Sequence, residues 1–76
     1  MLPKEKKQVE NSILDLWTEI RGLIENIDLD VRKNAAGNAS AGVRARKGLR
    51  KLKATAGALT KVTVEAEKAR KAEKAD

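Results

Sequence analysis

The sequence predicts an all-α protein, an antiparallel hairpin of two long helices. Ala, Leu, Lys, Glu and Arg dominate, the chain has no Phe or Tyr, and its single proline lies at position 3. These residue types favour helix, and a proline at the first helical position costs no hydrogen bond. Apolar residues recur at alternating steps of three and four in both halves of the chain, a spacing typical of helices that pack against each other.

The first helix is expected over about residues 3–33. Its apolar seam advances in steps of 4, 3, 4, 3 and 4 through Val9, Ile13, Leu16, Ile20, Leu23 and Ile27. Trp17, Ile24 and Val31 repeat every seven residues beside the seam and widen it, as in helices of a bundle. The opposite face is acidic, with Glu10, Asp15, Glu19, Glu25 and Asp28. Two pairs have the i,i+4 spacing of weak ion pairs, Arg21 with Glu25 and Asp28 with Arg32.

The segment of about residues 34–38 is the expected turn. Gly37 can adopt the left-handed conformation that ends a helix, and Asn38 is a favourable N-cap for the next one. Asn34 is a second candidate for the cap. The next helix is expected over about residues 38–71, followed by a frayed tail at 72–76.

The second helix has a narrower seam than the first. Its predicted members are Ala45, Leu49, Leu52, Ala56 and Leu59, continued more weakly by Val62, Ala66 and Ala69. Gly42 and Gly48 flank this seam, and small residues there would let the two helices approach closely.

The chain is expected to form one helical domain, residues 1–76, that associates with itself. So short a chain often needs a disulfide, a metal site or a partner to be stable, and because it has no cysteine and no histidine, disulfides and the usual zinc sites are excluded. The narrow second seam cannot cover the wide first one, which favours a homodimer of hairpins in a four-helix arrangement. The predicted oligomer core is Val9, Ile13, Leu16, Trp17, Ile20, Leu23, Ile24 and Ile27.

Nothing in the sequence indicates an enzyme. There is no histidine, and Glu65 and Glu67 lie two residues apart, on different faces of a helix. Ser12 and Ser40 have no neighbouring base, and the stretch GNASAG lacks the pattern of a phosphate-binding loop. We therefore expect no catalysis, cofactor, metal or small-molecule substrate. The sequence has no run of 18 apolar residues, and its first residues are not expected to form a signal peptide. We therefore expect a cytoplasmic protein without a membrane partner.

Charge is distributed unevenly along the chain. Residues 1–30 carry 4 basic and 7 acidic residues, and residues 31–76 carry 13 basic and 4 acidic ones, which gives net charges of −3 and +9. Between Arg32 and Lys61 lie nine basic residues and no acidic one. A surface that serves solubility alone mixes both signs, so this segment indicates a site for a polyanion. The candidate contacts are Arg44, Arg46, Lys47, Arg50, Lys51, Lys53 and Lys61, with Arg32 and Lys33.

Double-stranded DNA is the favoured polyanion. The basic arc has no aromatic residues for stacking and few amides for reading base edges, which favours phosphate contacts independent of base sequence. An anionic membrane is disfavoured, because the second helix has few bulky apolar residues free to insert. RNA stays possible, since these residues do not separate it from DNA. The alternative function is protein binding rather than nucleic-acid binding, by a helical interaction module whose basic face docks on an acidic protein.

Part of the basic half resembles a known family. The resemblance covers roughly residues 34–70 and depends on Gly37, Asn38, Ala41, Gly42, Arg44, Arg46 and Lys47, followed by Leu52 and Lys53. In these positions the chain is similar to the bacterial linker-histone-like nucleoid proteins found in chlamydiae and Bacteroidetes. The resemblance implies a small DNA-binding protein of the nucleoid that helps to compact DNA, with its cations on the phosphate backbone.

Overall fold

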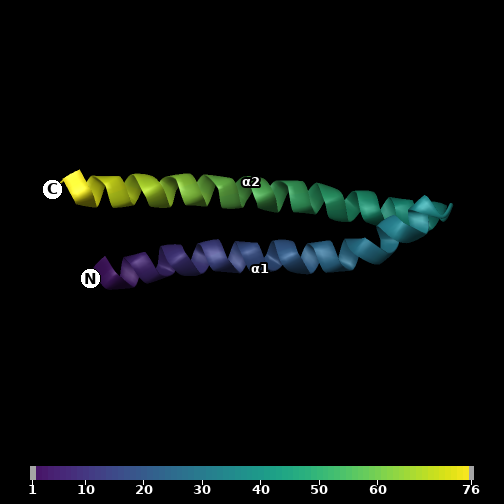
Figure 1. Ribbon diagram of the computed structural model, residues 1–76, viewed down its shortest axis with the longest axis horizontal. Coiled ribbons are helices and arrows are strands. Elements are labelled where there is room, and N and C mark those ends of the chain that lie inside the picture. The colour runs from purple at the N-terminus through teal and green to yellow at the C-terminus, as the bar shows by residue number, and fades with distance from the viewer. Residues whose placement is uncertain (1, 76) are drawn as a thin grey trace.

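The protein folds as a hairpin of two helices. The computed structural model describes the backbone of residues 2–75 and the side chains of residues 12–72. Helix α1 (Leu2–Ala35) and helix α2 (Ala39–Ala75) lie side by side and antiparallel, with the turn at one end and both termini at the other (Figure 1). The hairpin measures 58 × 17 × 12 Å. The predicted all-α hairpin is confirmed, and α2 continues to Ala75, beyond its expected end near residue 71.

Two predicted caps form the turn. Gly37 has a φ of 107°, and the N–H of Asn38 donates to the carbonyl of Lys33 at 3.0 Å while that of Gly37 donates to Asn34 at 2.9 Å. These two hydrogen bonds are those of a Schellman motif, which satisfies the last carbonyls of α1. The Oδ1 of Asn38 accepts a hydrogen bond from the N–H of Ala41 at 3.0 Å, so the same residue is the N-cap of α2. Asn34, the other candidate for the cap, lies inside α1.

The seam of α1 lies where its periodicity predicts. Ile20 and Ile27 are buried, at 6% and 7% exposure, and Ile13, Leu16 and Leu23 are half-buried. These five side chains pack within the hairpin, against α2. Of the predicted oligomer core, only Trp17 and Ile24 are largely exposed, and Val9 lies outside the residues whose side chains are described. Self-association itself stays a prediction.

The seam of α2 differs from the predicted one at three positions. Leu49 and Ala56 are exposed, and the buried or half-buried positions that replace them are Gly48 and Thr55. The observed seam runs through Ala41, Ala45, Gly48, Leu52, Thr55, Leu59, Val62 and Ala66. The hydroxyl of Thr55 donates to the carbonyl of Lys51 at 2.9 Å, so its polar group is satisfied within the helix. Ala69, expected to continue the seam, is exposed.

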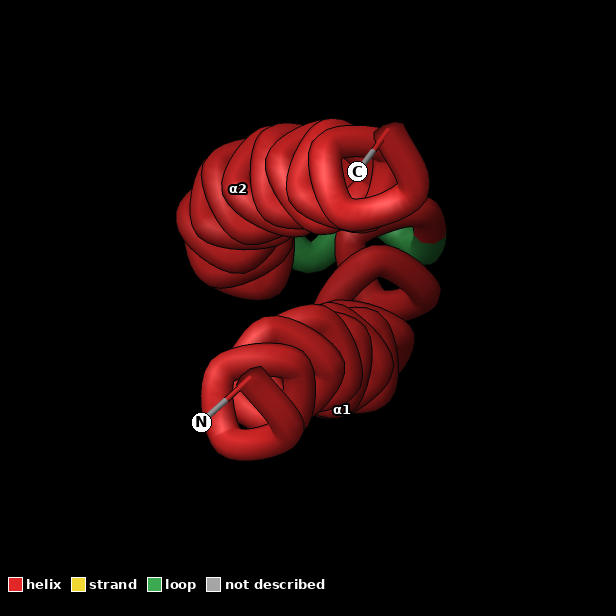
Figure 2. The backbone as a smooth tube through the Cα atoms, turned by 90° about the vertical axis from the view of Figure 1, so that its left-hand side faces the viewer, coloured by secondary structure: helices red, strands yellow, loops and turns green. Residues whose placement is uncertain are grey.

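Gly48 belongs to the seam because Ile27 lies against it. A Cβ built on Gly48 would come within 2.6 Å of Cγ1 of Ile27. A larger residue cannot fit there without displacing that side chain, so the predicted close approach at this glycine is confirmed. The space beside Gly42 is occupied in the same way, by the side chain of Asn34. The two helices are therefore closest near the turn, and they separate toward the termini (Figures 1 and 2).

Candidate nucleic-acid interface

All nine predicted contact residues have exposed side chains. Seven lie on α2, and Arg32 and Lys33 lie in the last turn of α1. Cations near a helix C-terminus are stabilised by the helix dipole, so these two also have a local role at the end of α1. Arg32 donates from Nε to Asp28 at 3.0 Å, which confirms the predicted i,i+4 pair. The pair expected between Arg21 and Glu25 does not form within the described residues.

The basic residues of α2 lie away from α1 because the seam fixes the orientation of the helix. Ala45, Leu52 and Leu59 face α1, and at about 100° per residue the positions of Lys47 and Arg50 point in the opposite direction. Residues 44–53 rise by about 14 Å along the axis and carry six cations. A DNA duplex presents one phosphate per about 1.7 Å of its axis, or about eight over this length. The basic surface and a duplex are therefore similar in charge density.

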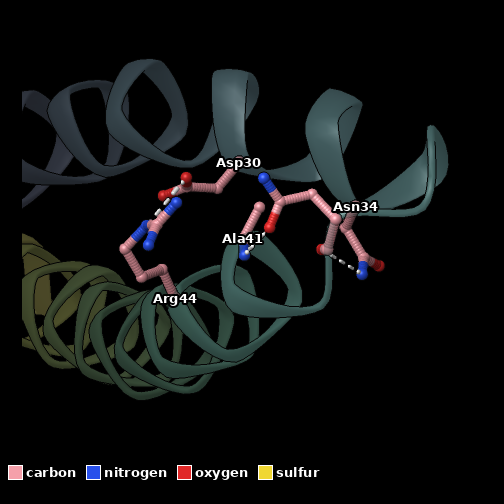
Figure 3. A network of polar contacts seen from close by, with 5 residues as sticks. Asp30, Asn34, Ala41 and Arg44 are labelled. Carbon is pink, nitrogen blue, oxygen red and sulfur yellow. Dashed lines mark hydrogen bonds and ion pairs between the residues drawn. The ribbon is translucent and has the colours of Figure 1, made fainter.

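Arg44 differs from the other cations of α2. Its Nε donates to Oδ1 of Asp30 at 3.1 Å, across the hairpin and 14 residues away in sequence (Figure 3). The Arg44 side chain is 55% exposed and that of Asp30 is 21% exposed. Part of the charge of Arg44 is thus compensated by α1, and a pair this exposed contributes about 0–1 kcal/mol to stability.

The sequence contains a signal for this pair that composition alone does not reveal. Asp30 follows Ile27 by three residues and so continues the seam of α1 as a polar member. A carboxylate at a half-buried seam position needs a polar partner on the facing helix. Asn34 occupies the next seam position, and its side chain also has a polar partner. Its amide nitrogen donates to the carbonyl of Asn38 at 3.2 Å (Figure 3). The hairpin end nearest the turn is therefore held by polar contacts as well as by small residues.

Of the nine candidate cations, Arg32 and Arg44 form ion pairs, and the other seven are available to a ligand. Within the described part of the chain no carboxylate is within ion-pair distance of them. No group of His, Cys, Asp or Glu that could hold a metal ion occurs in this part either. Neither helix, over its described residues, is long and apolar enough to cross a bilayer. The surface is an array of exposed positive charges on a helix, and it suits a polyanion with regularly spaced negative charges.

Comparison with known proteins gives one match. A family model described as Histone H1-like protein Hc1 matches residues 14–69, which include most of both helices and the turn. No curated protein and no solved structure matches the chain.

Proposed function

The chain belongs to the family of the histone H1-like protein Hc1, and we propose that it binds duplex DNA in the bacterial nucleoid without reading the base sequence. The observation that supports this proposal most is the carboxylate-free basic surface of α2, which the hairpin turns outward. Phosphate contacts supply essentially all of the affinity in nonspecific DNA binding. The side chains that read bases in the grooves or stack on them are nearly absent from this surface.

The contacts are proposed to come from two groups of cations. Arg46, Lys47, Arg50, Lys51 and Lys53 form the central group, each exposed and without an ion-pair partner among the described residues. Arg44, Lys61, Arg32 and Lys33 extend it along the hairpin. If about six of these cations each neutralise a phosphate, the logarithm of the association constant falls with a slope of about −5 against the logarithm of salt concentration.

Charge reversal tests the location of the site. The variant with Arg46→Glu and Arg50→Glu should lose DNA binding at moderate salt and keep the helicity of the wild type, because both side chains are exposed. A matched control, Lys68→Glu with Lys71→Glu, changes the net charge by the same amount farther along α2. Normal binding by the first variant, or an equal loss in both, would refute the assignment to this surface.

RNA and acidic proteins are the alternative ligands of the same surface. No residue of the described hairpin favours either over DNA, and competition between a duplex DNA and a structured RNA separates the nucleic acids. Docking on an acidic protein predicts weak DNA binding with little salt dependence and a fixed protein stoichiometry. We propose no catalytic function. The proposed nucleoid location follows from DNA binding and the family.

A further inference from the structure

The central cations of α2 lie in two rows along the helix. Arg50 is two residues, or about 200°, from both Gly48 and Leu52 of the seam, so it points away from α1. Measured around the helix from Arg50, Arg46 and Lys53 lie about 40–60° to one side, and we call them the first row. Lys47 and Lys51 lie about 60–100° to the other side and form the second row. All of these side chains are exposed.

The line between the two rows carries little charge. Val43, Ala54 and Gly57 lie within about 40° of Arg50 and occupy this line with it. All three are exposed, Val43 at 59%, and a Cβ built on Gly57 would meet nothing within 4 Å. A helix that lay flat on one chain of phosphates would need its cations along this line, where they come closest to the ligand. Cations on both sides of small and apolar residues instead suit a helix that lies between two chains of phosphates.

We propose that α2 lies in the major groove of B-form DNA, with one row of cations directed at the phosphates of each strand. The proposal rests on the function proposed above and specifies how the duplex is bound. A helix with its side chains is about 10–12 Å across, the major groove is about 12 Å wide, and the minor groove is about 6 Å wide. Only the major groove therefore admits α2 with cations on both of its sides.

The length of the basic segment fits the same site. Residues 44–53 rise by about 14 Å, and the major groove completes one turn in about 34 Å. Because an α-helix does not wind with the groove, it can follow the groove for only part of a turn. The next cation, Lys61, lies about 12 Å beyond Lys53 and only about 20° from Arg50 around the helix. Lys61 thus meets the strand that crosses α2 where the groove turns away.

The seam keeps α1 and its acidic residues outside the groove. The line between the rows points away from α1, so α1 lies on the side of α2 that is farthest from the bases (Figure 2). Asp15 and Glu25 of α1 are exposed, and each is two positions, or about 200°, from a seam residue, Ile13 or Ile27. Their carboxylates therefore face away from α2, which keeps them apart from the phosphates and limits the repulsion.

This site is compatible with binding that ignores base sequence. Val43, Ala54 and Gly57 have no side-chain hydrogen-bonding groups, so the line between the rows can face any base pair without an unpaired polar group. Arg50 lies between the rows, and its long side chain can turn to a phosphate of either strand.

The same geometry separates DNA from RNA. The major groove of an A-form RNA duplex is deep and narrow, and protein side chains do not enter it. We therefore expect an RNA duplex to bind at least about tenfold more weakly than a DNA duplex of the same sequence. Anisotropy with the two duplexes at one salt concentration measures the ratio. Equal affinities would overturn the groove proposal and leave the phosphate contacts of α2 intact.

Neutralising each row tests whether both strands are contacted. Arg46→Gln with Lys53→Gln removes the first row, and Lys47→Gln with Lys51→Gln removes the second, so the two variants are matched in charge. Each should reduce the magnitude of the salt slope by about 1.8, because each removes two phosphate contacts. All four side chains are exposed, and circular dichroism should show unchanged helicity. A reduction in only one of the variants would overturn the proposal, since it would place the DNA on one side of α2.

Methylation by dimethyl sulfate identifies the groove. This reagent modifies N7 of guanine, which lies in the major groove, and N3 of adenine, which lies in the minor groove. On a duplex saturated with the protein we expect several-fold protection of N7 and unchanged reactivity of N3. Protection of N3 alone, or of neither atom on DNA that anisotropy shows to be bound, would overturn the groove proposal while DNA binding stands. Absence of binding in the anisotropy measurement would overturn both this proposal and the proposed function.

Discussion

Asp30 of α1 and Arg44 of α2 are joined across the hairpin by an ion pair of 3.1 Å between Oδ1 and Nε. The pair connects the acidic helix to the first cation of the basic surface. Arg44 thus belongs both to the packing of the hairpin and to the proposed DNA site, and the two roles compete for one guanidinium group.

Releasing Arg44 is expected to strengthen DNA binding. In Asp30→Asn the neutral amide holds the guanidinium less firmly, so the affinity for DNA should rise and the salt slope should steepen by up to about 0.9. The free energy of unfolding should fall by about 1 kcal/mol or less, because the pair is partly exposed. Glu19→Gln removes the same charge from an exposed position of α1 and controls for net charge. Equal gains in both variants would show that Arg44 is not restrained by Asp30.

Alanine substitution of two glycines in α2 should give opposite results. In Gly57→Ala the new methyl group meets nothing within 4 Å, so the higher helix propensity of alanine should stabilise the hairpin by about 1 kcal/mol. In Gly48→Ala the methyl group would meet Ile27, and overpacking costs about 1–3 kcal/mol, which cancels or exceeds that gain. Thermal unfolding followed by circular dichroism measures both. An equal rise in Tm would contradict the close approach at Gly48.

Loss of the Asn38 cap should weaken the turn. Asn38→Ala removes the acceptor of the Ala41 N–H and should lower the free energy of unfolding by about 1 kcal/mol. Ser40→Ala, two residues away and exposed, has no side-chain hydrogen bond among the described residues and should change stability far less. Denaturant unfolding of the two variants compares them directly, and similar losses would argue against the cap.

Single neutralisations should change the salt dependence of DNA binding one charge at a time. Lys47→Gln and Arg50→Gln should each reduce the magnitude of the salt slope by about 0.9, because each removes about one phosphate contact. Arg21→Gln, an exposed cation on α1, should leave the slope unchanged. A slope that falls equally in all three would indicate a response to total charge rather than to contacts on α2.

Most local features of this fold could be predicted from the sequence, the pair of Arg21 with Glu25 excepted, and features that depend on the facing helix could not. The conformation of Gly37, the cap by Asn38 and the pair of Asp28 with Arg32 depend on neighbours in sequence, and each was confirmed. Both Leu49 and Gly48 satisfy alternating steps of three and four along α2. The choice between them depends on the facing helix, because Ile27 lies so close to Gly48 that a Cβ there would come within 2.6 Å of its Cγ1.

In the candidate site, too, local features could be predicted from the sequence and contacts between the two helices could not. The exposure of the cations follows from the helical periodicity, because the seam turns them outward. The seam position of Asp30 indicates that its carboxylate needs a polar partner, but that partner, Arg44, lies 14 residues away on the other helix, so no local spacing rule identifies it. The sequence predicted the wide stripe of Trp17, Ile24 and Val31, but the exposure of Leu49, which was expected in the seam of α2, required the register of the two helices.

The central claim is that the basic surface of α2 binds DNA phosphates without sequence preference. Fluorescence anisotropy with two unrelated duplexes of about 30 base pairs, at about 50 and 200 mM salt, tests it most directly. The proposed function predicts equal affinities for the two duplexes and a loss of about a thousandfold between the two salt concentrations. Absence of binding at the lower salt concentration, or a strong preference for one duplex that persists at high salt, would contradict it.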